Sequence, residues 1–266
     1  MRALTSLLAA HLFCACAAQT PRVDHGASDN PDTFMRQGFA GAAAVILPRG
    51  DERCYGECEM RFSPASSFKV PHALIALNAG VLSGPEHVFS WDGEERSVPA
   101  WNQDHTLASA IENSVVWYFQ RVAPRIGRER FEDELPRFGY GDANIGEDLT
   151  RFWLDDSLTV SPMEQARFWR RLHAGELPVT DEARDAVLEM TTLARRDGVV
   201  LRGKTGWHPS EPVGGWFVGS LQSPAGVTTF AVRLTAEGDY DAASFVAARR
   251  RVAEELLVEL GFAVPR

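Results

Sequence analysis

The residues with the clearest potential for chemistry are two lysines, Lys69 and Lys204. The chain has 27 basic residues, and all the others are arginine. An arginine stays protonated in proteins, whereas a lysine amine that is removed from water can lose its proton and act as a base or a nucleophile. A preference for arginine codons explains the many arginines but not the positions of the lysines, because each lysine lies in a short motif. We therefore expect both amines to have a role that arginine cannot fill.

The tetrapeptide Ser66-Ser67-Phe68-Lys69 can supply a nucleophile and its base. Positions i and i+3 of a helix lie on one face, so the Ser66 hydroxyl and the Lys69 amine would be neighbours. Serine is a weak nucleophile until a base takes its proton, and the free N–H groups at a helix start can stabilise an oxyanion. Taken alone, this tetrapeptide also fits an N-cap serine followed by a solvated lysine.

The second motif, Lys204-Thr205-Gly206, lies on a predicted strand late in the chain. It offers a cation, a hydroxyl group and a glycine that lets a substrate approach the backbone. Taken alone, it also fits a strand end that enters a turn. Together and in this order, the two motifs are marks of serine β-lactamases and penicillin-binding proteins.

A third motif, Ser114-Val115-Val116, narrows the resemblance. It has the S-x-V form and not the S-D-N form of class A enzymes. With it, the chain resembles the class D, oxacillinase-type, serine β-lactamases from about residue 41 to residue 262. The other segments that carry the resemblance are Pro64-Ala65-Ser66-Ser67-Phe68-Lys69, Trp101-Asn102-Gln103-Asp104-His105-Thr106-Leu107, Phe138-Gly139-Tyr140-Gly141-Asp142, Phe152-Trp153-Leu154 and Gly203-Lys204-Thr205-Gly206-Trp207.

The resemblance implies a role for each catalytic candidate. Ser66 would form the acyl-enzyme, and Lys69 would take up carbon dioxide to become an N6-carboxylysine that acts as general base. Such a reaction needs a neutral amine, which apolar neighbours favour. Trp153 would donate its indole N–H to the carboxylated lysine. Ser114 would pass a proton to the leaving nitrogen, and Lys204 would supply positive potential near that route.

The resemblance also implies a set of substrate-binding residues. Thr205 and an arginine of the last helix would bind the substrate carboxylate. Arg249, Arg250 and Arg251 are all candidates, and the distance from Gly261 favours Arg249. The backbone N–H groups of Ser66 and Trp207 would form the oxyanion hole. Val116 and Gly206 complete the predicted site, which contains no metal.

One position departs from the family pattern. Position 142 is aspartate where the family usually has asparagine. The change removes two amide donors and adds a charge, so it puts in doubt any hydrogen bond that the asparagine would donate.

The beginning of the chain is typical of an exported protein. Residues 1–18 have a basic start, a short apolar core and small residues that allow cleavage after Ala17 or Ala18, as in a signal peptide. Lipidation of Cys16 is the alternative, and it would leave a lipid anchor. We expect a flexible leader over residues 19–35, a catalytic domain over residues 36–266 and a periplasmic location.

Composition excludes some classes of partner. The net charge is −9 and no basic stretch is interleaved with aromatic residues, which argues against nucleic acid. No apolar run reaches the roughly 18 residues of a membrane span. The expected partners are small β-lactam molecules. Cys54 and Cys58 could close a small disulfide loop in an oxidising compartment, whereas zinc is a poor alternative because no second Cys pair or His-rich segment accompanies them.

The order of elements predicts an α+β fold of the serine β-lactamase and transpeptidase type. An antiparallel sheet is built from both chain ends and packed by helices, and the middle of the chain forms a mainly helical subdomain. The predicted strands cover residues 42–47, 199–202, 215–221 and 228–234. The predicted helices begin near residues 66, 106, 161, 180 and 241, and the second is expected to run from Thr106 to about Val122.

Two other functions share the nucleophile. A penicillin-binding transpeptidase or carboxypeptidase forms an acyl-enzyme that resists water, and a β-lactam sensor domain binds without turnover. The S-x-V, Tyr-Gly and Phe-Trp-Leu motifs argue against the first, and the lack of a membrane helix in the sequence argues against the second. The preferred class of β-lactam depends on pocket shape, and the sequence leaves it open, as it does the oligomeric state.

Overall fold

A computed structural model describes residues 23–25, 32–210 and 213–265. The predicted signal peptide, residues 1–18, and the alternative lipidation site Cys16 lie outside these residues. Within the described ranges, no helix is both long and apolar enough to cross a membrane.

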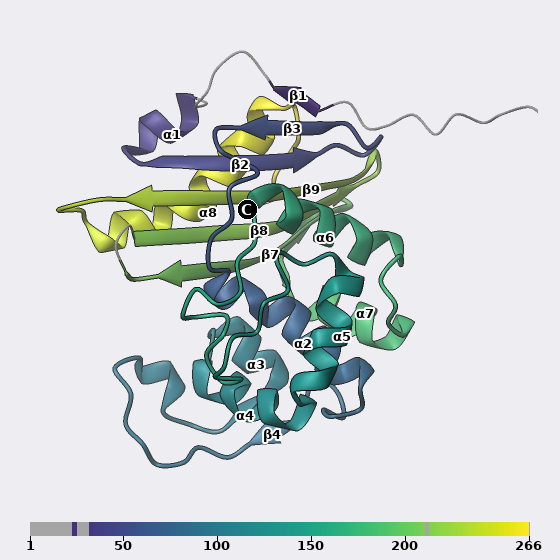
Figure 1. The fold of residues 1–266 in the computed structure, drawn as a ribbon. Coiled ribbons are helices and arrows are strands. Elements are labelled where there is room, and N and C mark those ends of the chain that lie inside the picture. Colours follow the sequence, from purple (N-terminus) through teal and green to yellow (C-terminus); the bar gives the residue numbers. More distant parts are fainter. Residues whose placement is uncertain (1–22, 26–31, 211–212, 266) are drawn as a thin grey trace, which may run out of the picture.

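The centre of the fold is a seven-stranded sheet with strand order β1-β3-β2-β9-β8-β7-β6 (Figure 1). Its strands are β1 (Val23–His25), β2 (Ala40–Ile46), β3 (Glu52–Tyr55), β6 (Thr192–Arg196), β7 (Val199–His208), β8 (Val213–Ser223) and β9 (Gly226–Ala236). All neighbours pair antiparallel except β1 and β3, which are parallel. Because β2 pairs with β9, the two ends of the chain meet in one sheet, which confirms the predicted α+β architecture.

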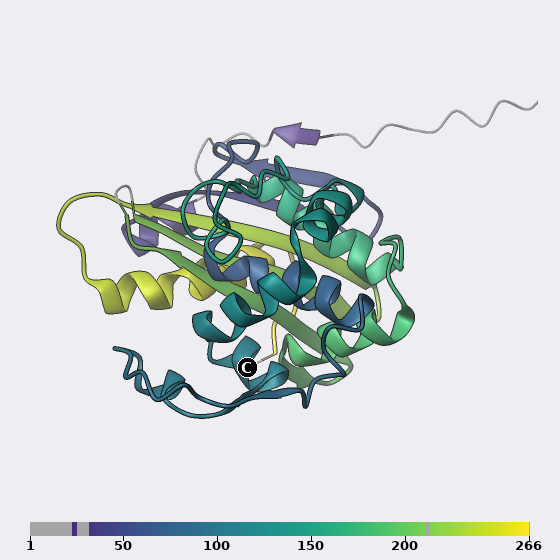
Figure 2. The same ribbon diagram turned by 60° about the horizontal axis from the view of Figure 1, so that its bottom comes forward.

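Helices cover both faces of this sheet. α1 (Asp32–Gln37) and α8 (Ala242–Glu259) pack on one face, where Phe245 and Val252 are buried against the strands. α6 (Pro162–Ala174) packs on the other face. The remaining helices form the helical subdomain on that second side, which Figure 2 brings forward. They are α2 (Lys69–Asn78), α3 (Leu107–Glu112), α4 (Val116–Ile126), α5 (Arg128–Phe138) and α7 (Asp181–Met190), with the short strands β4 (Val88–Phe89) and β5 (His105–Thr106) beside them.

Several helix starts are set by side chains that cap them. Ser161 accepts a hydrogen bond from the backbone N–H of Glu164, whose carboxylate accepts one from the N–H of Ser161. Thr180 caps α7 and Asp241 caps α8 more simply, since each side chain accepts a hydrogen bond from a backbone N–H of the first turn. A capping side chain satisfies N–H groups that have no partner inside the helix.

The helix predicted from Thr106 to about Val122 is wrong as a single element. Thr106 caps α3, but α3 ends at Glu112 and α4 begins at Val116. Between them Ser114 has a φ angle of +55°, in the left-handed region that residues with a side chain rarely adopt. The backbone therefore leaves the helix at the serine that the S-x-V motif contributes.

The other differences concern short elements. The helix expected from Ser66 begins as a 3-10 turn, Ala65–Phe68, before α2. β3 and β6 were not predicted, because neither is long and β6 is mostly exposed, so no apolar alternation marks it. Part of the predicted flexible leader over residues 19–35 has regular structure, since β1 and the beginning of α1 fall within it.

Cys54 and Cys58 form the predicted disulfide bond. Their Cα atoms are 5.7 Å apart, within the usual range for such a bond. The bond links β3 to the turn that follows it, and β3 lies next to the edge strand β1.

Candidate active site

Ser66 lies in the 3-10 turn directly before α2, where it meets Lys69. The Lys69 amine donates a hydrogen bond of 2.7 Å to the Ser66 hydroxyl oxygen. The neighbouring Ser67 cannot take the same role, because its buried hydroxyl donates to the Pro64 carbonyl and accepts from the Gln165 amide, each at 2.7 Å. Of the two serines in the motif, only Ser66 is placed as the nucleophile.

Lys69 is fully buried, in surroundings that favour its neutral form. Its amine lies 5.5 Å from the centre of the Phe119 ring, and Phe68 and Trp153 are also fully buried. Burial, and after it the charge of Lys204, hold the pKa of Lys69 well below its usual value. The apolar environment predicted for this lysine is therefore present, and its amine can act as a base or a nucleophile.

The second and third motifs meet at Ser114 and Lys204. The Lys204 amine donates a hydrogen bond to the Ser114 hydroxyl oxygen, and only 5% of the lysine is exposed. Burial, and after it the positive charge of Arg249, lower the pKa of Lys204 to about 7. This pair can therefore move a proton at neutral pH.

Gly206 allows β7 to lie directly against the nucleophile turn, the 3-10 turn Ala65–Phe68 that contains Ser66. A Cβ atom at this position would be 2.8 Å from the Pro64 carbonyl oxygen and 3.3 Å from the Ser67 backbone nitrogen. A glycine is therefore needed for the close approach. The next residue, Trp207, leaves 45% of its surface exposed.

The three arginines of α8 have different surroundings. Arg249 is 7% exposed and donates to the Gly206 carbonyl oxygen at 2.6 Å. Arg250 pairs with Glu254 at 2.6 Å, and Arg251 donates to the Gln37 side chain at 3.0 Å. Burial lowers the pKa of Arg249 to about 10, which leaves it charged at neutral pH. Of the three candidates, Arg249 is the one in contact with the Lys-Thr-Gly strand.

A cavity of about 460 Å³ opens beside these residues. Lys204 and Thr205 line one side of it, and Ile111 of α3 lines another. Thr205 is half-buried, and Val116 is also half-buried at the first position of α4. The cavity therefore adjoins the part of the site that contains Lys204 and Thr205.

The charges of the site are unbalanced. Lys69, Lys204 and Arg249 are buried basic groups, and none of them forms an ion pair with a carboxylate anywhere in the described residues. The indole N–H of Trp153 is buried too, and it has no hydrogen-bond partner among those residues. A buried donor without a partner is costly. A carboxyl group on Lys69 would supply both the missing negative charge and an acceptor, so these residues fit the predicted modification.

Within the ranges that the structure covers, no group of three or more His, Cys, Asp or Glu side chains is placed to hold a metal ion.

The tyrosine of the Tyr-Gly motif is tied to the nucleophile turn. The Tyr140 hydroxyl donates to the Gln165 side-chain oxygen at 3.1 Å, and Gln165 in turn donates to Ser67. The role of Gln165 was not predicted from the sequence, because nothing near it in the chain marks it.

Asp142 works as an acceptor and not as a donor. Its carboxylate accepts hydrogen bonds from the Thr159 backbone N–H at 3.0 Å, the Thr159 hydroxyl at 2.7 Å and the Asn144 N–H at 3.2 Å. An aspartate satisfies this arrangement, so the departure from the family pattern leaves the loop hydrogen-bonded.

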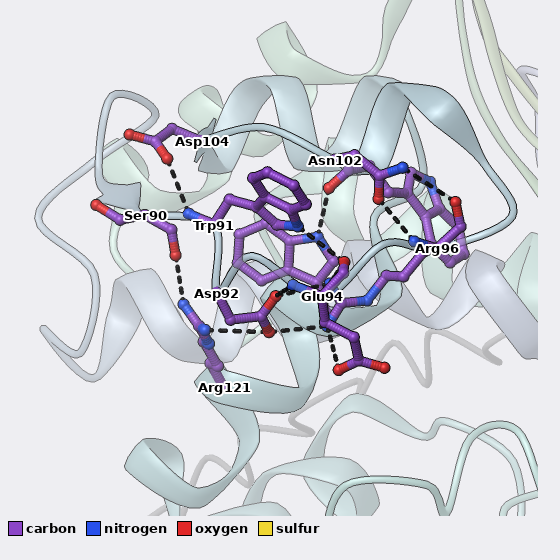
Figure 3. A network of polar contacts seen from close by, with 10 residues as sticks. Ser90, Trp91, Asp92, Glu94, Arg96, Asn102, Asp104 and Arg121 are labelled. Carbon is purple, nitrogen blue, oxygen red and sulfur yellow. Dashed lines mark hydrogen bonds and ion pairs between the residues drawn. The ribbon is translucent and has the colours of Figure 1, made fainter.

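A polar network holds the segment 90–104 in place (Figure 3). The Asp92 carboxylate accepts two hydrogen bonds of 2.8 Å from Arg96 and forms an ion pair of 3.3 Å with Arg121. The hydrogen bond from Arg96 keeps the pKa of Asp92 well below its usual range. Arg96 and Asn102 also exchange hydrogen bonds, of 2.9 and 3.0 Å.

This segment reaches the S-x-V motif through Trp101. The Trp101 indole donates to the carbonyl oxygen of Asn113, directly before Ser114, at 2.9 Å. The Trp117 indole of α4 donates to the Trp101 carbonyl at 2.9 Å. The two tryptophans thus hold both sides of the turn that carries Ser114.

The arrangement matches known proteins over most of the chain. The family model for the penicillin binding protein transpeptidase domain matches residues 25–257. A probable β-lactamase, YbxI of Bacillus subtilis, is 38% identical over 216 residues, which cover 81% of this chain and 79% of that protein. The crystal structure of a class D β-lactamase, YbXI from Nostoc, is 35% identical, with a TM-score of 0.82 over 87% of this chain and 98% of that one. This chain belongs to the class D β-lactamase family.

Two further relatives support the assignment, and the first of them is matched over less than two thirds of its own length. β-Lactamase OXA-20 of Pseudomonas aeruginosa is 38% identical over 176 residues, which cover 66% of this chain and 65% of that protein. The class D β-lactamase FUS-1 of Fusobacterium nucleatum has a TM-score of 0.81 at 30% identity, over 86% of this chain and 96% of that one. The predicted family and fold are confirmed.

Proposed function

We propose that this protein hydrolyses the amide bond of β-lactam antibiotics through an acyl-enzyme on Ser66. The observation that carries the proposal is the pair of contacts Lys69–Ser66 and Lys204–Ser114 in one buried site. In each pair, a lysine amine whose pKa is lowered forms a hydrogen bond with a serine hydroxyl. The first pair serves the attacking oxygen, and the second serves the leaving nitrogen. The names of the related class D enzymes support the same activity.

In the acylation step, Ser66 attacks the β-lactam carbonyl carbon as its proton leaves toward Lys69. The carbon–nitrogen bond of the ring then breaks, and Ser114 gives its proton to the nitrogen while Lys204 replaces that proton. The pKa of Lys204, about 7, suits it to this proton transfer at neutral pH, and burial keeps the pKa of the Lys69 amine well below its usual value. Water then releases the acid product from Ser66.

The substrate is held by groups on either side of the nucleophile. Thr205 and Arg249 bind its carboxylate, and the backbone N–H groups of Ser66 and Trp207 bind the oxyanion. The contact of Arg249 with the Gly206 carbonyl supports this assignment. Val116 and Gly206 border the bound ring.

Lys69 carries a carboxyl group derived from carbon dioxide. Bound there, the group supplies an anionic base for both acylation and deacylation. Lys69 offers a neutral amine, Trp153 offers an N–H without a partner in the described residues, and Lys204 and Arg249 offer a positive potential. All three support the modification.

We also infer that the protein is exported to the periplasm. The Cys54–Cys58 disulfide supports an oxidising compartment. Mass analysis of the exported protein tests this, because cleavage after Ala17 or Ala18 and lipidation of Cys16 give different amino termini.

Steady-state hydrolysis of a chromogenic cephalosporin tests the function directly. We expect many turnovers per enzyme molecule, with a rapid rate at low enzyme concentration. A single stoichiometric burst would instead identify a penicillin-binding transpeptidase or a sensor. Release of a terminal D-alanine from a peptidoglycan-like peptide then separates those two, because only a carboxypeptidase cleaves it.

A further inference from the structure

His72 is a buried histidine without a hydrogen-bond partner, one helical turn after Lys69. Its side chain is fully buried in α2. Neither ring nitrogen forms a hydrogen bond with any residue in the described ranges. Native proteins satisfy nearly all buried polar groups, so each exception needs an explanation. An apolar side chain would fill the same space without this cost.

The surroundings of His72 are aromatic and exclude its protonated form. The rings of Phe119, Phe131 and Trp153 lie edge-on to it, with centroids 5.1 to 5.2 Å away. Burial, and after it the charge of Lys69, lower the pKa of His72 to about 3. At neutral pH the ring therefore has one N–H donor and one acceptor nitrogen. No carboxylate or basic group other than Lys69 contributes to this pKa.

His72 lies close to two groups that would interact with a carboxyl group, the Lys69 amine and the Trp153 indole N–H. Phe119 lies against both the His72 ring and the Lys69 amine, at 5.1 and 5.5 Å. Trp153, whose indole N–H also has no partner in the described chain, is the neighbour of His72 at 5.2 Å. Two unpartnered donors therefore lie around one desolvated amine.

A carboxylated Lys69 would need more than one donor. A carboxyl group has two oxygens and about four lone-pair sites. The Ser66 hydroxyl and the Trp153 indole can occupy only part of them. His72 is a further donor in the same buried region.

We propose that the neutral ring of His72 donates a hydrogen bond to carboxylated Lys69 and so stabilises the modification. This inference rests on the proposed carboxylation of Lys69. His72 acts as a positioning residue, since it would act on the modified lysine and not on the substrate. The occupancy of the modification, and not only the rate of hydrolysis, then depends on it.

The test is a titration with ¹³C-labelled bicarbonate after acid removal of the carboxyl group. Carbon-13 NMR measures how much carboxylated lysine forms in the wild type, His72→Phe and His72→Asn. We expect His72→Phe to need at least about tenfold more bicarbonate for half occupancy, which corresponds to about 1.4 kcal/mol. His72→Asn keeps an amide donor and should recover part of this loss.

A matched control is His173→Phe. His173 is a half-buried histidine, but it has a partner, the Ser220 hydroxyl at 2.7 Å, and it is not among the rings around Lys69. We expect it to leave the bicarbonate titration unchanged. A second readout needs no variant: the ring nitrogen resonances of His72 should shift when bicarbonate is added to the wild type.

The outcomes separate the two proposals. If the wild type shows a carboxylated lysine and His72→Phe takes up bicarbonate like the wild type, the role of His72 is refuted while the proposed function stands. Ring resonances of His72 that do not respond to bicarbonate would refute it as well, even if His72→Phe failed to fold. Turnover without any carboxylated lysine in the wild type would overturn the modification itself, and His72 with it.

Discussion

Replacing Arg249 with alanine should weaken the capture of carboxylate-bearing β-lactams far more than replacing Arg250 or Arg251. Only Arg249 is buried against the Lys-Thr-Gly strand, through its contact with the Gly206 carbonyl. Arg250 pairs with Glu254 at the edge of the cavity, and Arg251 contacts Gln37 on the far side of the helix.

The expected size follows from the lost hydrogen bond. A hydrogen bond to a charged group contributes about 1.5–3 kcal/mol. Since 1.4 kcal/mol is a factor of ten, kcat/KM should fall about 10- to 150-fold in Arg249→Ala. Arg251→Ala should stay within about twofold, because exposed charges contribute little. Arg250→Ala should lie between them, since Arg250 lines the cavity.

A pH profile adds a second, independent readout. The charge of Arg249 is one cause of the low pKa of Lys204, after burial. Without that charge the pKa of Lys204 rises above about 7, so its ammonium form persists to higher pH. The alkaline limb of kcat/KM should therefore move to higher pH in Arg249→Ala and stay in place in Arg251→Ala.

The assay is the initial rate of penicillin hydrolysis between pH 5 and 10, with thermal unfolding of each variant as a check on folding. Equal losses in all three variants would refute the reasoning, because they would indicate a diffuse electrostatic effect. An alkaline limb that does not move in Arg249→Ala would refute the coupling to Lys204.

Three further predictions concern the nucleophile, its base and the close approach of β7. Ser66→Ala should abolish turnover and covalent labelling by penicillin; a penicilloyl adduct found by mass spectrometry on that variant would point to Ser67 instead. Lys69→Arg should lose deacylation, since a guanidinium can neither take up carbon dioxide nor serve as base. Trp153→Ala should depend on added bicarbonate far more than the wild type. Full wild-type rates of both variants in bicarbonate-free buffer would contradict these expectations. Gly206→Ala should lower kcat/KM at least tenfold, because its Cβ would meet the Pro64 carbonyl oxygen at 2.8 Å, and circular dichroism should show the fold retained; an unchanged rate would mean that the nucleophile turn can move away without cost.

The sequence predicts the site better than it predicts the local backbone that builds it. Short motifs mark Ser66, Lys69, Ser114 and Lys204, and the structure brings all four together. Their spacing in the chain does not show that the helix breaks at Ser114, since the apolar pattern continues on both sides and no glycine or proline marks the positive φ angle.

What the sequence misses depends on long-range contacts. His72 looks like an ordinary residue of an apolar helix, and only the packing of four aromatic rings reveals that its nitrogens have no partner in the described chain. Gln165 lies far from Ser67 in sequence, and its hydrogen bond forms only when α6 packs beside α2. Such pairings follow from tertiary structure and not from local pattern.

The most direct test of the central claim is a rapid-quench experiment with penicillin, followed by intact-protein and peptide mass spectrometry. We expect a penicilloyl adduct on the peptide that contains Ser66, formed within the first turnover and lost as hydrolysed product accumulates over many turnovers. An adduct that persists while no further product appears would contradict the claim, and so would sustained hydrolysis without any adduct on Ser66.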